Sequence, residues 1–146
     1  MKNKKEGIKD VILKSLDSLG YNYQKKKQAN DSLIVHFPIQ LENNCCELSI
    51  TWNAKIQTLS IVNLPYIKIT SNYFRSVTDY VTTINAKLKL GAFVLSKENN
   101  EFYLRISFVL NAIDESSLIK NIDLSCLLLE RYIPEVVDLI SVNENL

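Results

Sequence analysis

The stretch LIVHFPIQLENNCCELSITWNAKIQTLSIVNLP, residues 33–65, decides the fold class. Apolar residues occupy every second position of its first two runs, Leu33 to Leu41 and Cys46 to Trp52. A period of two is typical of a β-strand with one buried face. A third apolar run extends from Ile56 to Leu64, and short Asn-containing breaks separate the three runs. The stretch therefore predicts three consecutive strands of an antiparallel meander.

Helical periodicity lies on both sides of this meander. Apolar residues recur at helical spacing between residues 5 and 19, and Gly20 follows where a helix C-cap is expected. A second helical stripe runs from Phe74 to Leu88, with Ser71 or Asn72 as its N-cap. The chain thus alternates a helix, a group of strands and another helix.

The last third of the chain predicts a hairpin and a long helix. Apolar positions around Phe93 and from Phe102 to Leu110 alternate about a polar turn at residues 98–100. Asp114 is a suitable N-cap for a final helix, which Pro134 should kink or split.

Grouped strands with helices between the groups favour an α+β fold with an antiparallel sheet. The expected order is α-β-β-β-α-β-β-α, with a further short strand at Tyr21 to Lys26 as an option before the meander. A chain of 146 residues without an internal linker or repeat is expected to form a single domain over 1–146. The exposed edge of the sheet is expected in the Ile56 to Leu64 strand or in the Tyr21 to Lys26 segment.

Charge is nearly balanced over the whole chain but uneven along it. The sequence holds 17 Lys and Arg against 16 Asp and Glu, for a net charge of +1, which argues against nucleic-acid or membrane binding. Residues 1–27 hold eight Lys and three acids, a net of +5. This basic segment is either a solvated surface or a docking edge for an acidic partner.

The residues that enzymes and metal sites need are scarce. One His, three Gly and three Cys cannot supply a glycine-rich nucleotide loop or a usual four-ligand zinc site. We therefore expect no enzyme activity and no catalytic, cofactor-binding or metal-binding residues. His36 has no partner nearby in sequence, while Cys45 and Cys46 should point to opposite faces of one strand.

Three further observations favour a cytoplasmic protein. The cysteines are odd in number and two of them are adjacent, unlike a secreted disulfide framework. The basic start of the chain is not followed by the apolar core of a signal peptide. No stretch approaches the ~20 apolar residues of a membrane helix.

The segment GAFVLSKENNEFYLRISFVLNAIDESSLIKNIDLSCLLLERYIPEVVDLI, residues 91–140, resembles the C-terminal half of the bacterial YbjN-like domains. The matching positions are Gly91, Phe93, Tyr103, Arg105, Tyr132 and Pro134. The order of elements in the whole chain is also similar to that of the class I type III secretion chaperones. Those chaperones are usually acidic overall, whereas this chain carries a net charge of +1.

The resemblance implies a non-enzymatic adaptor or chaperone-like protein, a homodimer that holds an extended segment of a partner protein. Independently, the Ile56 to Leu64 run carries apolar residues at both odd and even positions, so one of its faces needs cover beyond its own sheet. We expect five residues of the predicted strands to contact the partner: Leu59, Ile61, Trp52, Tyr103 and Val109.

Two other functions remain open at this level. An immunity or antitoxin protein that inhibits a partner enzyme would carry a strongly charged exposed patch. A small-ligand sensor or regulator would carry a closed apolar pocket with convergent polar groups.

Overall fold

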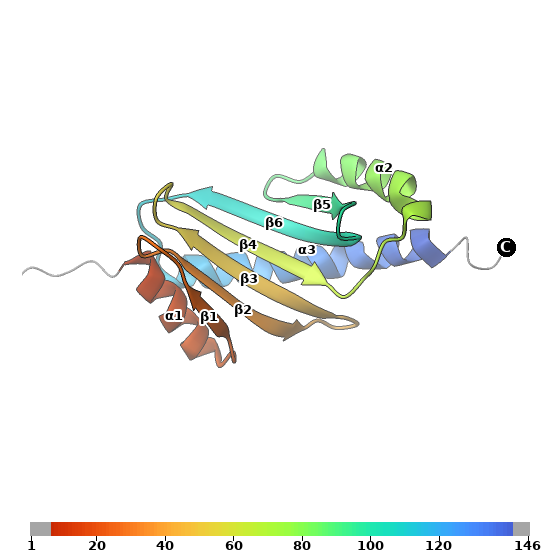
Figure 1. Ribbon diagram of the computed structural model, residues 1–146. Helices are drawn as coiled ribbons and strands as arrows, with labels where there is room; N and C mark the ends of the chain where they lie inside the picture. Colours follow the sequence, from red (N-terminus) through yellow and green to blue (C-terminus); the bar gives the residue numbers. More distant parts are fainter. Residues whose placement is uncertain (1–6, 142–146) are drawn as a thin grey trace, which may run out of the picture.

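A six-stranded antiparallel sheet and three helices make up most of the protein (Figure 1), whose computed structural model describes residues 7–141. The elements in chain order are α1 (Ile8–Leu19), β1 (Gln24–Lys27), β2 (Leu33–Gln40), β3 (Cys45–Asn53), β4 (Thr58–Pro65), the short 3₁₀ helix η1 (Ser71–Tyr73), α2 (Phe74–Asn85), β5 (Ala92–Ser96), β6 (Glu101–Val109) and α3 (Glu115–Ser141). The α+β class and the order of elements are confirmed, with β1 as the optional extra strand.

The strands lie in the order β1-β2-β3-β4-β6-β5, and each neighbouring pair is antiparallel. One row of buried side chains crosses four strands, because Ile50 lies opposite both Val35 and Ile61, and Ile61 lies opposite Ile106. The period of two in the sequence therefore places its apolar positions on one common face.

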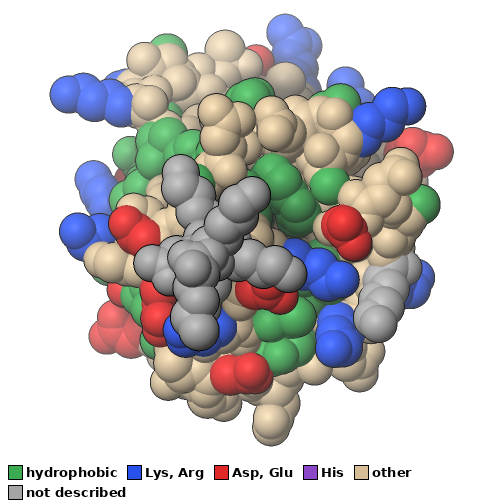
Figure 2. All heavy atoms as spheres, turned by 90° about the vertical axis from the view of Figure 1, so that its left-hand side faces the viewer, with side chains coloured by type: hydrophobic (Ala, Val, Ile, Leu, Met, Phe, Trp, Pro, Cys, Tyr) green, Lys and Arg blue, Asp and Glu red, His purple; other side chains and the backbone are tan. Residues whose placement is uncertain are grey.

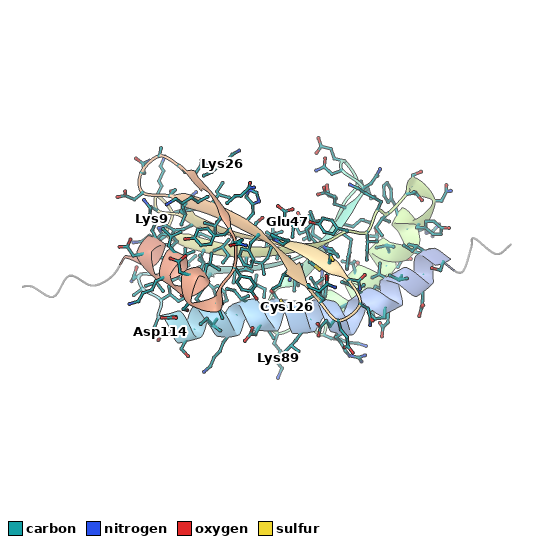
Figure 3. The ribbon with its side chains drawn as sticks, turned by 90° about the horizontal axis from the view of Figure 1, so that it is seen from below. Lys9, Lys26, Glu47, Lys89, Asp114 and Cys126 are labelled. Carbon is teal, nitrogen blue, oxygen red and sulfur yellow. The ribbon has the colours of Figure 1, made fainter. Side chains whose placement is uncertain are left out.

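That apolar face is covered by helices. In Figure 3, α1 and α3 lie on the same side of the sheet, and α3 contacts β4 and β6. Ile12 and Leu16 of α1 are fully buried against this face. α2 lies beside β5, at one edge of the sheet, and also contacts α3 (Figure 1).

The third strand of the meander departs from expectation at its start and in its position. Ile56 is exposed and belongs to the turn before β4, where Gln57 adopts a left-handed backbone with φ 52°. The expectation that the Ile56 to Leu64 strand forms a sheet edge is wrong, because β4 pairs with β3 on one side and β6 on the other.

The helix ends confirm some predictions and correct others. Gly20 ends α1 with a left-handed φ of 76°. Asp114 caps α3, because its Oδ1 accepts a hydrogen bond from the Ser117 backbone amide at 2.7 Å. Hydrogen bonds from the backbone and the side chain of Ser117 lower the pKa of the Asp114 carboxyl. The predicted side-chain cap at Ser71 or Asn72 is wrong, because η1 precedes α2 and neither helix start has a side-chain cap bond.

Pro134 does not split the last helix. α3 continues from Glu115 to Ser141 through the proline. Buried residues lie on both sides of Pro134, with Leu129 and Ile133 before it and Val136 after it. Burial of both segments against the sheet compensates for the hydrogen bond that a proline removes. The predicted extent of the first helix, from residue 5, lies partly outside the described residues.

Candidate functional site

The two edges of the sheet differ in whether another element covers the edge strand. At one edge, α2 closes β5 through the amide of Asn85. Its Nδ2 donates to the Phe93 carbonyl oxygen at 2.9 Å, and its Oδ1 accepts from the Phe93 amide at 2.8 Å. One side chain thus satisfies the donor and the acceptor that another strand would otherwise bind.

At the opposite edge, β1 is open. Within residues 7–141, Gln24–Lys27 pairs with β2 alone. Lys25 and Lys26 are exposed and point to opposite faces, because Lys25 lies opposite the buried Val35 and Lys26 opposite Ile34. The segment Tyr21 to Lys26 is one of the two edges that the sequence predicts, and the edge position of β1 confirms it.

A polar pocket of about 260 Å³ lies at the start of β1, on the sheet face opposite the helices. Its lining residues are Asn22, Gln24, His36, Pro38, Glu47 and Tyr66. His36 Nδ1 and Glu47 Oε1 lie 2.9 Å apart, and desolvation together with the Glu47 carboxylate raises the pKa of the Tyr66 phenol. His36 therefore has a partner that sequence proximity did not reveal, since the pair forms across two strands.

A second pocket, of about 360 Å³, lies at the other end of β1. It is formed by the β1–β2 turn together with Ile34, Thr51, Trp52 and Lys55. The open strand therefore has a side-chain pocket at each end. Trp52 lines this second pocket although only 8% of its surface is exposed.

The five residues predicted to contact a partner do not form one surface. Leu59 and Ile61 are fully buried on the helix-covered face, and Trp52 is almost so. Tyr103 is half-buried on the open face, whereas Val109, at the end of β6, is 81% exposed. Partner contact by these residues stays a prediction, but Leu59 and Ile61 offer no surface to a partner in this conformation.

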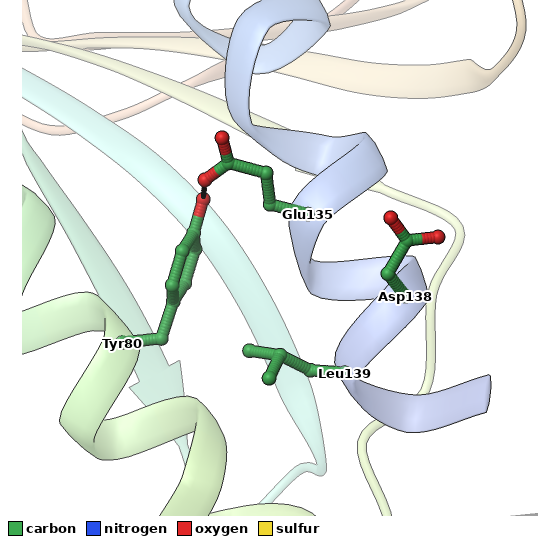
Figure 4. Close-up of a pocket in the computed structure, with 4 residues that line it drawn as sticks. All are labelled: Tyr80, Glu135, Asp138 and Leu139. Carbon is green, nitrogen blue, oxygen red and sulfur yellow. Dashed lines mark hydrogen bonds between the residues drawn. The ribbon is translucent and has the colours of Figure 1, made fainter. Parts of the chain in front are cut away.

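A third pocket lies between α2 and α3, away from β1 (Figure 4). Tyr80, Glu135, Asp138 and Leu139 line a volume of about 240 Å³. The Tyr80 hydroxyl donates to Glu135, and burial together with this bond raises the pKa of the Tyr80 phenol. The contact joins two helices and is best explained as part of their packing.

The cysteines are arranged as the strand pattern predicts. Cys45 is exposed and Cys46 is buried, on opposite faces of β3. Burial raises the pKa of the Cys46 thiol to about 12. Cys126 of α3 is partly buried and accepts a long contact from Asn63 Nδ2 at 3.8 Å. In the described part of the chain, no group of three or more His, Cys, Asp or Glu residues is placed to hold a metal ion.

Charges of both signs share the end of the molecule that carries the β1–β2 turn and α1. Figure 2 views this end and shows Lys and Arg side chains projecting around its rim, with Asp and Glu side chains among them. Among the described residues, the lysines of the N-terminal sequence lie on α1, at Lys9 and Lys14, and on β1, at Lys25 to Lys27, while Asp10 and Asp17 lie on α1 as well.

Residues 9–138 match the family model of YbjN, described as "Putative bacterial sensory transduction regulator". No curated protein matches the chain. Among the described helices, none is both long and apolar enough to cross a membrane. The matched segment covers α1 through most of α3, and with it the whole sheet, both of its edges and the pockets beside β1. The chain belongs to the YbjN family.

Proposed function

We propose that this protein is a non-enzymatic regulator that binds an extended, acidic segment of a partner protein along β1. The observation that carries the proposal is the contrast between the two sheet edges: Asn85 closes β5, while β1 is open and basic. The family description, a regulator of sensory transduction, supports a binding role.

Strand addition suits this edge for physical reasons. An extended segment beside β1 would bond to backbone groups that β2 does not use. Its side chains would alternate between the two faces of the sheet. Those on the open face would lie near Gln24 and Lys26, within reach of the pockets at either end of β1. Backbone bonds would supply affinity and the pockets would supply specificity.

Charge selects the kind of segment. If two copies of β1 paired side by side, Lys25 and Lys26 of one copy would lie close to Lys25 and Lys26 of the other. These like charges would repel each other. A segment with Asp or Glu at two neighbouring positions would instead pair with both lysines, because neighbouring residues of a strand point to opposite faces, as Lys25 and Lys26 do. The partner segment is therefore acidic and is not β1 of a second molecule.

A second candidate function is small-ligand sensing at the pocket beside β1. It is favoured by the convergence of His36, Glu47 and Tyr66 on one polar volume. The immunity hypothesis gains no such support, because the end of the molecule in Figure 2 carries charges of both signs rather than one strongly charged patch.

The test is a selection of displayed random dodecapeptides on the immobilised protein, followed by affinity measurement on the enriched sequences. We expect acidic, β-prone sequences, and new amide protection at Gln24–Lys27 in hydrogen exchange when they bind. The Lys25→Glu, Lys26→Glu double variant should lose at least about tenfold in affinity, because two attractions become repulsions.

The matched control is Lys87→Glu, Lys89→Glu, which changes net charge equally at two exposed lysines between α2 and β5. Figure 3 shows Lys89 on the side of α3, away from Lys26. This variant should keep the affinity of the unmodified protein. Enrichment of basic or amphipathic helical peptides, or equal loss in both double variants, would reject strand addition at β1.

A further inference from the structure

The polar pocket at the start of β1 brings together side chains from separate stretches of the chain. They come from the segment around β1 and from β2, β3 and the end of β4: Asn22, Gln24, His36, Pro38, Glu47 and Tyr66. The volume of about 260 Å³ is smaller than the roughly 300–1,000 Å³ of pockets that hold drug-sized ligands. The pocket therefore suits a small molecule.

Glu47 is the acidic residue of this pocket, and Figure 3 shows it on the side of the sheet away from α3. Its Oε1 lies 2.9 Å from His36 Nδ1, and this ring nitrogen carries the hydrogen because an ionised carboxylate can only accept. Desolvation together with the Glu47 carboxylate raises the pKa of the Tyr66 phenol, so this hydroxyl keeps its hydrogen and can also donate to Glu47. Neither contact requires a positive charge on the donor.

The pocket holds acceptors that its own donors do not use. An ionised carboxylate has about four acceptor positions, more than His36 and Tyr66 occupy. The side-chain oxygens of Asn22 and Gln24 are further acceptors. No described Lys or Arg lines the pocket, since Lys26 lies on the same face but outside the lining. The missing component is therefore a positively charged donor.

We propose that this pocket binds a small organic cation, a primary ammonium group on a short apolar chain, with Glu47 as its counter-ion. The three N–H donors of an ammonium match the Glu47 carboxylate and the side-chain oxygens of Asn22 and Gln24. Pro38 and the Tyr66 ring line the same volume and offer apolar surface to the chain. The inference deepens the second candidate function and rests on it, because that function is ligand binding in this pocket.

Proton NMR of the full chain tests the site through two single residues. His36 is the only histidine and Trp52 the only tryptophan of the sequence, so each ring gives one set of signals. Titration with n-butylammonium to about 20 mM, at about pH 8 where alkylamines are protonated, should shift the His36 signals saturably. Trp52 lines the pocket at the other end of β1, so its signals should stay unchanged. n-Butanol and butyrate, which have the same chain length, should shift neither ring.

A pair of variants tests the counter-ion. Glu47→Gln removes the charge but keeps the shape of the side chain, and it should weaken n-butylammonium binding at least about tenfold. Glu101→Gln is the matched control, because Glu101 lies on the same face of the sheet, outside the pocket, with a side chain 31% exposed against 39% for Glu47. It should keep the affinity of the unmodified protein.

A second amine distinguishes two sources of the ammonium group. n-Butylammonium represents a free amine, and Nα-acetyl-lysine methylamide represents the lysine side chain of a peptide. A saturable shift of His36 with either compound supports the site, and the tighter binding of the two identifies the source.

Four results would overturn the proposal: no saturable shift with either amine, an equal shift with n-butanol, a shift of Trp52 in place of His36, or undiminished binding in Glu47→Gln. A response of His36 to butyrate or n-butanol but not to amines would reject the ammonium and keep ligand binding in the pocket. No response to any of the four compounds would reject both. Peptide binding at β1 is measured separately, so its loss would leave these outcomes unchanged.

Discussion

Replacing Asn85 with Ala should destabilise the protein by opening the edge that α2 closes. The substitution removes two hydrogen bonds, of 2.9 and 2.8 Å, between the amide and the backbone of Phe93. Each is worth about 0.5–1.5 kcal/mol, so the free energy of unfolding should fall by about 1–3 kcal/mol. For a chain of this length the melting temperature should drop by about 2–10 °C.

The assay combines urea unfolding with hydrogen exchange at Phe93, whose amide should lose protection in Asn85→Ala. Asn121→Ala is the matched control, because Asn121 makes a single exposed bond to Ser117 on its own helix. It should change stability by no more than about 0.5 kcal/mol.

Asn85→Asp sharpens the test. Its carboxylate would still accept from the Phe93 amide but would face the Phe93 carbonyl, which raises its folded-state pKa. The variant should therefore gain stability as the pH falls and the carboxyl protonates. If Asn85→Ala matches the unmodified protein in both stability and Phe93 protection, the amide does not close this edge and the contrast with β1 fails.

Four further predictions concern the burial of side chains. Asn63→Leu should raise the free energy of unfolding in urea titrations by about 1 kcal/mol, since among the described residues the buried Asn63 Oδ1 has no hydrogen-bond partner. The Nδ2 contacts that the change removes are long, 3.3 Å to Ser125 and 3.8 Å to Cys126, and a loss of stability would show that they outweigh the relief at Oδ1. Because burial raises the pKa of Cys46 from 9.0 to about 12, the unfolded chain ionises first and stability should fall as the pH rises through that interval. This slope should be smaller in Cys46→Ala but not absent, because the pKa values of Cys126 and Tyr80 are raised as well. Iodoacetamide should label Cys45 in the native protein and Cys46 only after unfolding. Leu59→Ala should cost about 2–5 kcal/mol and Val109→Ala no more than about 0.5 kcal/mol by thermal unfolding, and similar values would contradict their assigned burial.

The sequence by itself determined the elements and which of their faces are buried. The alternation from Leu33 to Leu41 and the helical stripe after Asp114 each reappear as an element with the expected apolar side covered. These features are local, because a strand or helix places its residues by its own periodicity. The resemblance of residues 91–140 to YbjN-like domains is likewise visible in the sequence alone, and the YbjN family model matches residues 9–138.

Only the tertiary structure decided which strands are neighbours and which edge is open. Leu59 lies opposite Phe108, a residue far along the chain, and this pairing makes β4 an inner strand rather than an edge. The bond of His36 to Glu47 and the closure of β5 by Asn85 also join residues from different elements. Periodicity specifies the face of each strand but not its neighbour, because strand order depends on how the whole chain buries its apolar surface while satisfying its backbone hydrogen bonds.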